Sequence, residues 1–267
     1  MICQLTPKDL TRIYPEIDFL VAEGNVSSRY VIAVHQAFYQ FAADQIDGGF
    51  ILDAGCGTAF GTEILARKAK LAFGIDVKDK LIEYAKKTHI NNKVFLGVMD
   101  VGDVGFKDAS FNAIIADELL EHLPNHKPFL GEAVRLLQPG GLFVCATVNR
   151  RHTFGPADNP LNRNHYREYD VTDFRKEIEQ YFTDVTILGQ GFGEGFQKYM
   201  QTPSARLIEW ILVKLNMKHR IPPSWRAQVR GLISGVKVNN SKPEEFAVTD
   251  KEVENSLYLV AVARKRA

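Results

Sequence analysis

A short apolar strand that ends in a glycine-rich turn is the feature that most constrains the fold of this chain. The run Phe-Ile-Leu at 50–52 is typical of a buried strand. Asp53 follows it, and the turn after Asp53 carries Gly55 and Gly57. A helix is predicted to begin near residue 58 and to run through 58–66. Strand, glycine turn and helix in this order are how a doubly wound α/β sheet binds a nucleotide, because glycine lets a ligand approach the backbone closely.

The spacing of the glycines bears on which nucleotide is bound. A dinucleotide fingerprint reads G-x-G-x-x-G, but here the third glycine, Gly61, comes one residue late. The Asp53 carboxylate is awkward beside a pyrophosphate and suits a ligand with a cationic end, such as S-adenosylmethionine. Asp76, at the end of the next predicted strand, is placed to accept hydrogen bonds from both ribose hydroxyls. An aspartate there fits NAD as well as S-adenosylmethionine.

Four segments of the chain then match one family in order and at the usual distances. They are ILDAGCGTAFGTEILA at 51–66, AFGIDV at 72–77, FNAIIADELLEHL at 111–123 and LLQPGGLFVCATVN at 136–149. On these segments the chain resembles the small-molecule group of class I S-adenosylmethionine-dependent methyltransferases. The resemblance implies an α/β fold with a doubly wound, mostly parallel seven-stranded sheet whose last strand is reversed. It also implies S-adenosylmethionine as methyl donor and S-adenosylhomocysteine as product.

The resemblance also implies which residues bind the cofactor. They follow the ends of the first four predicted strands, and Asp100 is expected at the adenine amino group with Met99 and Val101 as walls of the ring. One departure is Ala59, where the family usually has glycine; its methyl group is expected to crowd the methionine part of the cofactor. The predicted cofactor-binding residues are Asp53, Gly55, Cys56, Gly57, Thr58, Asp76, Val77, Met99, Asp100, Val101 and Asp117. The three cysteines lie far apart without metal-ligand spacing, and no metal site is predicted.

The candidate catalytic residues come from two loops. Glu121 and His122 match a family signature after the fourth predicted strand, although both side chains could equally tie that loop to neighbouring backbone. The stretch 159–169 resembles the Asn-Pro-x-His-x-Arg-Glu segment of some bacterial sugar and polysaccharide methyltransferases, with four residues instead of one between Pro160 and His165. His165 is the first choice as general base, because an unperturbed histidine pKa of about 6.5 allows it to accept a proton at neutral pH.

The chain is expected to form a single methyltransferase domain over residues 1–267. Cap helices are predicted over 1–48, the cofactor-binding core over 49–188, a lid or acceptor insert over 189–250, and the final strand over 251–267. An amphipathic helix is expected after Ser27 or Ser28, and it is expected either to pack on the sheet or to close over the cofactor. The polar residues of such a cap are Tyr14, Glu23, His35 and Tyr39.

The insert contains a basic and apolar stretch over 204–242, with eight Lys or Arg against one acid. A helix within it is apolar nearly all round, which favours a buried lid or a homodimer element. The alternative is a membrane-surface contact for a lipid-linked or phosphorylated acceptor. The net charge of +1 argues against nucleic acid as a partner. No apolar run reaches 18 residues, so a transmembrane segment is not expected, and the cytoplasm is the expected location.

These features predict an enzyme that moves a methyl group from S-adenosylmethionine to a small-molecule or glycan acceptor, at oxygen, by in-line displacement. A carbon methyltransferase of quinone-type biosynthesis shares the core motifs and is one alternative. A non-catalytic S-adenosylmethionine-binding protein is another, since Ala59 replaces the usual glycine. A NAD-dependent oxidoreductase is disfavoured by the late third glycine and by the other three segments.

Overall fold

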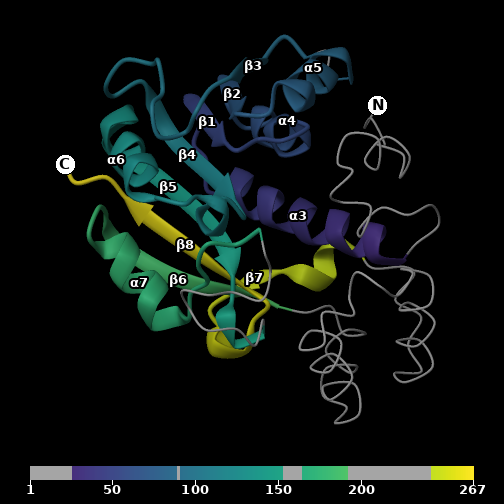
Figure 1. The fold of residues 1–267 in the computed structure, drawn as a ribbon, viewed down its shortest axis with the longest axis vertical. Coiled ribbons are helices and arrows are strands. Elements are labelled where there is room, and N and C mark those ends of the chain that lie inside the picture. The colour runs from purple at the N-terminus through teal and green to yellow at the C-terminus, as the bar shows by residue number, and fades with distance from the viewer. Residues whose placement is uncertain (1–25, 89–90, 153–163, 192–241) are drawn as a thin grey trace. The chain divides into compact units, whose positions relative to one another are not determined.

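The computed structural model describes residues 26–88, 91–152, 164–191 and 242–267 of the chain (Figure 1). They fall into two units. The larger unit, here called the core unit, holds the described residues of 38–191 together with 248–267. The smaller holds residues 26–37 and 242–247, and each unit is described separately.

The core unit is built on one sheet whose strand order is β3-β2-β1-β4-β5-β8-β6-β7. Neighbouring strands from β3 to β5 are parallel, and β8 is antiparallel to both β5 and β6. This confirms the predicted doubly wound, mostly parallel sheet with a reversed last strand. The strands are β1 (Phe50–Ala54), β2 (Leu71–Asp76), β3 (Val94–Val98), β4 (Phe111–Asp117), β5 (Leu137–Val148), β6 (Thr183–Gln190), β7 (Val248–Thr249) and β8 (Tyr258–Arg264).

An eighth strand, β7, is present in addition to the seven that were predicted. It is two residues long and pairs with the end of β6, where Gly189 faces Thr249. Both partners belong to the stretch 189–250 that was assigned to an insert. The two ends of that stretch therefore extend the sheet, while residues 192–241 and Tyr14 and Glu23 of the predicted cap lie outside the described residues.

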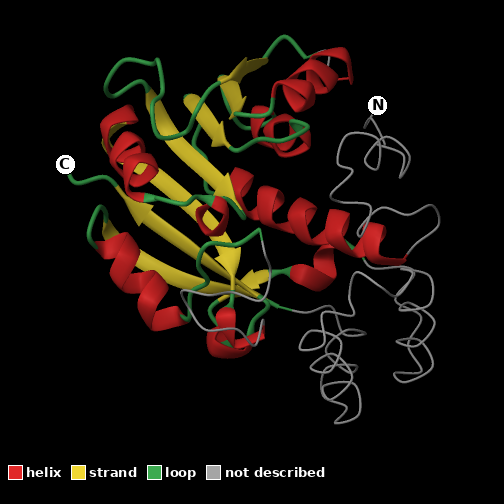
Figure 2. Ribbon diagram, viewed as in Figure 1, coloured by secondary structure: helices red, strands yellow, loops and turns green. Residues whose placement is uncertain are grey.

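Helices lie on both sides of the sheet (Figure 2). The described helices are α3 (Val26–Asp44), α4 (Phe60–Ala66), α5 (Asp79–Thr88), α6 (Lys127–Leu136) and α7 (Val171–Glu179), with short 3-10 turns η2 (Leu120–His122), η3 (Arg150–His152), η6 (Pro243–Phe246) and η7 (Val253–Asn255). In the smaller unit, the Phe246 side chain of η6 is fully buried. Within the described residues, no helix combines the length and apolar character needed to span a membrane.

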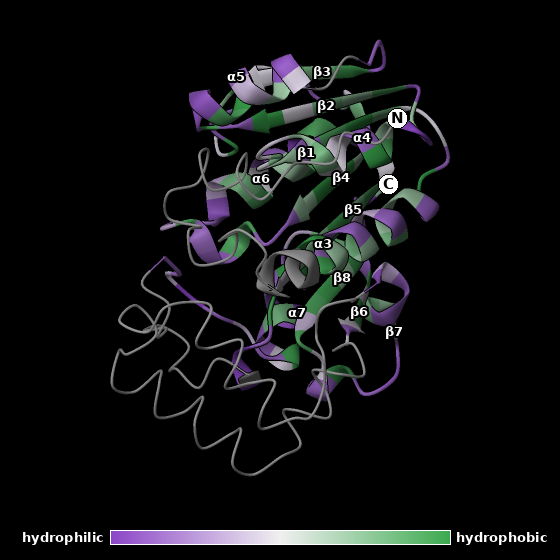
Figure 3. Ribbon diagram, turned by 90° about the vertical axis from the view of Figure 1, so that its right-hand side faces the viewer, coloured by the Kyte–Doolittle hydropathy of each residue, from purple (hydrophilic) through white to green (hydrophobic). Residues whose placement is uncertain are grey.

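Alternate residues of the central strands enter two separate apolar cores. Ile114 of β4 and Phe143 of β5 pack with α6 and α7 on one face of the sheet. Ile115 and Val144, one position further along, pack on the other face with α4 and the core-unit part of α3. Successive side chains of a strand point to opposite faces, so apolar residues at every position are required in a sheet covered on both sides. Figure 3 shows these strands mainly in the hydrophobic colours.

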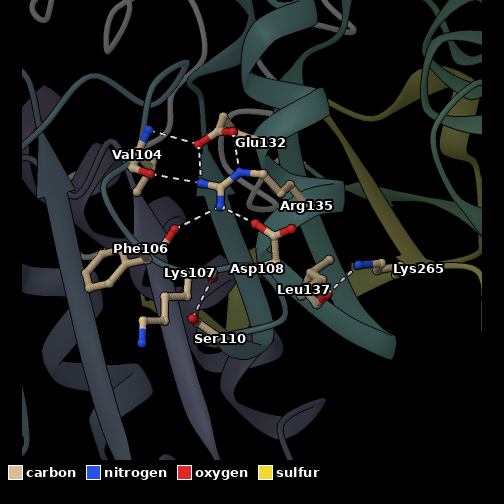
Figure 4. A network of polar contacts seen from close by, with 9 residues as sticks. All are labelled: Val104, Phe106, Lys107, Asp108, Ser110, Glu132, Arg135, Leu137 and Lys265. Carbon is tan, nitrogen blue, oxygen red and sulfur yellow. Dashed lines mark hydrogen bonds and ion pairs between the residues drawn. The ribbon is translucent and has the colours of Figure 1, made fainter.

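A polar clamp centred on Arg135 secures the opposite, amino-terminal end of β4. The Arg135 guanidinium donates to both Glu132 carboxylate oxygens, each at 2.7 Å, and to Asp108 at 2.7 Å (Figure 4). It also donates to the carbonyl oxygens of Phe106 and Val104 at 2.8 and 2.9 Å. The Arg135 clamp, meaning these five residues, thus fastens the loop before β4 to helix α6.

Candidate active site

The parallel strands bring the predicted site residues to one edge of the sheet. Asp53 of β1 lies beside Gly74 of β2 and Ile115 of β4, and Asp117 of β4 lies beside Ala146 of β5. Ligands of doubly wound sheets bind outside the carboxyl ends of the strands. The ends of β1 to β5 and the loops that follow them are called the carboxyl edge below.

The glycine turn after β1 is held against the end of β2. Gly55 and Gly57 have positive φ angles of 75° and 53°, which side chains other than glycine adopt at a cost. The N–H groups of Gly55 and Cys56 both donate to the Ile75 carbonyl oxygen, at 2.8 and 2.9 Å. The Gly57 N–H donates to the Asp76 carboxylate at 3.0 Å. The structure therefore joins the turn and Asp76, as a nucleotide site requires.

Asp53 lies under the turn, with its carboxylate fully buried. One oxygen accepts a hydrogen bond from the Tyr39 hydroxyl at 3.0 Å, and the other accepts one from the Thr62 hydroxyl at 2.5 Å. Burial raises the pKa of Asp53 to about 7, although both hydroxyl donors act in the opposite direction. Asp53 thus places a buried carboxyl group, partly ionised at neutral pH, below the turn, and its role as a cofactor-binding residue stays a prediction.

Gly61, the glycine that comes one residue late, has a packing explanation. The Tyr39 ring lies against it, and a Cβ atom at position 61 would come within 2.0 Å of the Tyr39 Cζ atom. No such contact is tolerated between nonbonded carbons. The third glycine of the motif therefore makes room for a side chain of α3, and the sequence motif did not reveal this.

Ala59 occupies the left-handed region, with φ at 61°, and directly precedes α4. The helix consequently begins at Phe60, two residues later than predicted. The Ala59 side chain is fully buried, so its methyl group contacts protein atoms and does not project into open space at the turn. The expected crowding of the cofactor stays a prediction, and the buried methyl gives it no support. Cys56 and Thr58 are also buried, and burial raises the pKa of the Cys56 thiol.

The end of β2 offers a carboxylate beside exposed apolar side chains. Asp76 is half-buried, and its second oxygen accepts from the Lys78 N–H at 2.9 Å. The next residue, Val77, is 67% exposed, and Val98 at the end of β3 is 51% exposed. Exposed valines beside a carboxylate suit the ribose and the flat face of an adenine. Val98 was missed from the sequence because strand periodicity alone does not tell which end residues stay uncovered.

The other predicted adenine residues differ in accessibility. Met99 is half-buried, while Val101 is 7% exposed and belongs to the apolar core. The Asp100 side chain is exposed and accepts a hydrogen bond from the Gly102 N–H at 2.8 Å, which is a turn contact. Val101 thus has little surface to offer a ring, and its role as a wall of the adenine site stays a prediction. Asp117 is half-buried at the end of β4.

Glu121 ties the loop after β4 to the end of β5. Its carboxylate is fully buried and accepts hydrogen bonds from the Thr147 hydroxyl at 3.0 Å and from the Val148 N–H at 3.3 Å. Burial, and then the charge of Glu118, raises the pKa of Glu121 to about 8. These contacts match the structural alternative considered for Glu121. They also leave a carboxyl group that exchanges a proton near neutral pH.

The structure brings His122 and His165 together, while the Glu121 carboxylate faces the end of β5. The segment 164–168 lies on the loop after β4, where the Tyr166 N–H donates to the Glu121 carbonyl oxygen at 2.7 Å. The ring of His165 meets that of His122 edge to face, with centroids 4.8 Å apart. His122 Nδ1 lies 2.9 Å from the Asn164 carbonyl oxygen, and partial desolvation lowers the pKa of His122.

His165 has a partner that the sequence reasoning did not assign. Its Nδ1 atom lies 2.7 Å from the Glu168 carboxylate, and the side chains of His165 and Glu168 are 7% and 0% exposed. The signal was present as His-x-x-Glu within the quoted loop motif, but spacing alone does not show that two loop side chains meet. A carboxylate beside Nδ1 fixes the orientation and tautomer of a histidine.

The comparisons with known proteins bear on the class of enzyme and on the fold. A family model described as a methyltransferase domain matches residues 52–145. A probable S-adenosylmethionine-dependent methyltransferase of Mycolicibacterium smegmatis is 26% identical over 246 residues, which cover 90% of this chain and 91% of that protein. A methyltransferase structure from Thermotoga maritima matches with a TM-score of 0.61 at 14% identity, covering 100% of both chains, and shows the shared fold.

Two further relatives, one named for demethylmenaquinone and one for ubiquinone biosynthesis, match a shorter region. A demethylmenaquinone methyltransferase of Tropheryma whipplei is 33% identical over 110 residues, covering 41% of this chain and 46% of that protein. A ubiquinone biosynthesis O-methyltransferase of Coxiella burnetii is 32% identical over 108 residues, covering 39% of this chain and 46% of that protein. Both alignments are short enough to report on the shared core alone.

The doubly wound sheet with its reversed strand β8 has the Rossmann-like fold that methyltransferase structures share. With the family match and the relatives, the chain is a class I S-adenosylmethionine-dependent methyltransferase, and S-adenosylmethionine is its cofactor. The predicted fold class, enzyme class and cofactor are confirmed.

Proposed function

We propose that this methyltransferase acts on a hydroxyl oxygen of a small-molecule or glycan acceptor, with His165 as general base. The observation that carries the proposal is the pairing of His165 with the buried Glu168, at the carboxyl edge of the sheet and beside His122. A histidine whose far nitrogen is held by a carboxylate is the arrangement that enzymes use to take a proton from a hydroxyl.

The Glu168 carboxylate favours the tautomer in which Nδ1 of His165 carries the proton. The lone pair is then on Nε2, which is the nitrogen that accepts the proton of the acceptor hydroxyl. His122 limits how the His165 ring can turn, because the two rings meet edge to face. The carbonyl oxygen of Glu121 accepts a hydrogen bond from the Tyr166 N–H, and this contact holds the loop that carries His165 beside His122. His165 is thus the proposed base, and Glu121 and His122 are proposed to shape its surroundings.

The residues at the ends of β1, β2, β3 and β4 fit S-adenosylmethionine. The Asp76 carboxylate suits the ribose hydroxyls, Val77 and Val98 suit the adenine, and the negative charges of Asp53 and Asp117 suit a cationic ligand. When bound, S-adenosylmethionine supplies a methyl group already activated by its sulfonium. The acceptor oxygen forms a bond to that methyl carbon as the sulfur–carbon bond breaks, and His165 takes the hydroxyl proton. Orientation alone can lower such a barrier by on the order of 7–11 kcal/mol.

A carbon acceptor of the quinone type is the second candidate. The observation in its favour is the similarity of the core to the demethylmenaquinone methyltransferase named above. The similarity to a quinone-pathway O-methyltransferase is equally strong and supports oxygen. The His165–Glu168 pair would accept the proton that is released at either kind of acceptor, so the methylated atom is decided by product analysis.

The proposal is tested by methyl transfer from labelled S-adenosylmethionine to a catechol, a monosaccharide and a naphthoquinol, with product analysis by mass spectrometry and NMR. With a productive acceptor, His165→Ala is expected to lower kcat by roughly 10²–10⁴-fold. The dissociation constant for S-adenosylmethionine is expected to stay unchanged, because His165 is not among the cofactor residues.

His126→Gln is the matched control. His126 is a buried histidine that pairs with Glu177 of α7 at 2.7 Å, and it is expected to affect stability while leaving kcat unchanged. Full turnover by His165→Ala would remove the base assignment. A carbon-methylated naphthoquinol as the one product would move the proposal to the second candidate.

A further inference from the structure

Tyr39 connects helix α3 to the cofactor turn through two separate contacts. Its ring fills the space that Gly61 leaves open at the start of α4. Its hydroxyl donates to Asp53 at the end of β1, at 3.0 Å. The side chain is 6% exposed and packs in the same apolar core as Ile51 and Ile64. A buried tyrosine hydroxyl usually has a hydrogen-bond partner, and here that partner is the carboxylate that precedes the glycine turn.

We propose that Tyr39 is a positioning residue for S-adenosylmethionine, acting through Asp53. The hydroxyls of Tyr39 in α3 and Thr62 in α4 each donate a hydrogen bond to one carboxylate oxygen of Asp53. Asp53 is two residues from Gly55, so its position sets where the turn leaves β1. Tyr39 therefore fixes both the path of the turn and the negative charge beneath it.

The charges around Asp53 explain why its donors matter. Asp76 at the end of β2 and Asp117 at the end of β4 both oppose the ionisation of Asp53, and the Cys56 thiol of the turn also lies within its field. The hydroxyls of Tyr39 and Thr62 are the groups that lower this pKa against burial.

Removing the Tyr39 hydroxyl should therefore raise the pKa of Asp53 further above 7. At neutral pH, a larger fraction of Asp53 would then be protonated, and the site would attract the cationic cofactor less. At higher pH, Asp53 would ionise again and most of the affinity would return. A purely structural role of Tyr39 has no reason to follow this pH dependence. The inference uses the established cofactor and is independent of the acceptor and of His165.

Tyr39→Phe is the informative variant, because it keeps the ring over Gly61 and removes the hydroxyl alone. Isothermal titration calorimetry with S-adenosylmethionine at pH 6 to 9 gives the ratio of the variant and wild-type dissociation constants, which cancels titration of the ligand itself. We expect this ratio to be on the order of 10 at neutral pH, the loss typical of a hydrogen bond to a charged group, and to shrink toward pH 9. Thr62→Val removes the other donor and should change the ratio in the same direction.

Tyr181→Phe is the matched control, because Tyr181 is a half-buried tyrosine near α7, outside the carboxyl edge. The ratio of the dissociation constants of Tyr181→Phe and the wild type for S-adenosylmethionine should stay at unity across the pH range. A ratio of unity for both Tyr39→Phe and Thr62→Val would overturn the inference. A loss of affinity that is the same at every pH, together with a lower Tm, would also overturn it, because that result describes a packing role alone.

Discussion

The carboxyl edge and the Arg135 clamp use buried or half-buried glutamates in opposite ways. In the clamp, Glu132 receives two hydrogen bonds from the Arg135 guanidinium, which lowers the pKa of Glu132. At the carboxyl edge, the Glu121 carboxylate is fully buried. It accepts hydrogen bonds from the Thr147 hydroxyl and the Val148 N–H, and neither donor carries a positive charge. Burial therefore dominates there and raises the pKa of Glu121 to about 8.

This difference shows that the Arg135 clamp has a structural role, whereas the carboxyl edge keeps ionisable groups where a ligand can bind. The five hydrogen bonds of Arg135 occupy every donor of its guanidinium, which leaves none for a ligand. The carboxyl edge keeps charges that are held by weaker donors and that lie where ligands of this fold bind. Perturbed ionisable groups gather at functional sites for this reason.

The largest effect that separates the two regions is expected for cofactor binding. Asp76→Ala removes the carboxylate that holds the Gly57 N–H and that is proposed to bind the ribose. The dissociation constant for S-adenosylmethionine should rise by roughly 10–100-fold, since hydrogen bonds to a charged group are worth about 1.5–3 kcal/mol. Isothermal titration calorimetry with S-adenosylmethionine measures this dissociation constant.

Arg135→Ala is the control from the clamp. It should lower the Tm by removing five hydrogen bonds and leave the dissociation constant for S-adenosylmethionine unchanged. Equal cofactor affinity in Asp76→Ala and wild type would contradict the role assigned to Asp76. Weaker binding in Arg135→Ala would show that the two regions are coupled.

The pH dependence of stability should differ in sign between the two glutamates. The pKa of Glu121 is about 8 in the folded chain against 4.5 when unfolded, so the folded state holds more protons between these values. Its contribution to stability is present below about 4.5 and is lost as the pH rises toward 8. Glu121→Gln stays neutral, so its stability relative to wild type should increase from pH 5 to pH 8.

Glu132→Gln should show the opposite trend. The folded-state pKa of Glu132 is lowered, so its contribution is present above the unfolded pKa and is lost as the pH falls through the folded value. Urea unfolding at a series of pH values measures both variants. Parallel pH profiles for Glu121→Gln and Glu132→Gln would contradict the contrast drawn between the two regions.

The smallest effect is expected at Ala59, which lies at the carboxyl edge but contributes no charge. Glycine at this position relieves the left-handed backbone, while it removes a buried methyl group and makes the unfolded chain more flexible. These effects oppose one another, so Ala59→Gly should change the free energy of unfolding by less than about 1 kcal/mol. The affinity for S-adenosylmethionine should be unchanged. Tighter binding by the variant would show that the methyl group crowds the cofactor after all.

Much of the fold could be predicted because its signals are local. The apolar strand, the glycine turn and Asp76 lie within 27 residues, 50–76, and strand periodicity identifies the buried core around them. The position of β7 could not be predicted, because a two-residue strand carries no periodicity. The start of α4 was predicted too early because an alanine in a left-handed conformation is not visible in the sequence.

The candidate site divides in the same way. Glu121, His122 and His165 could be proposed from motifs, but the contact between the two histidines depends on the loop at 164–168 lying against the turn after β4. The partnership of His165 with Glu168, and that of Tyr39 with Asp53, needed the folded chain. Such contacts join loops and helices through side-chain geometry, for which residue spacing holds no information.

The amino-acid sequence was enough to establish the class of this protein: a doubly wound methyltransferase that uses S-adenosylmethionine. Its motifs are short stretches in which the backbone must take one conformation or a side chain must bring one charge to the ligand. These requirements restrict the residue types at fixed positions, so the motifs can be recognised in the sequence. The tertiary structure established what surrounds those motifs, including why Gly61 is glycine and why Asp53 and Glu121 have raised pKa values. Burial and hydrogen-bond partners set those properties, and both arise when distant segments pack together.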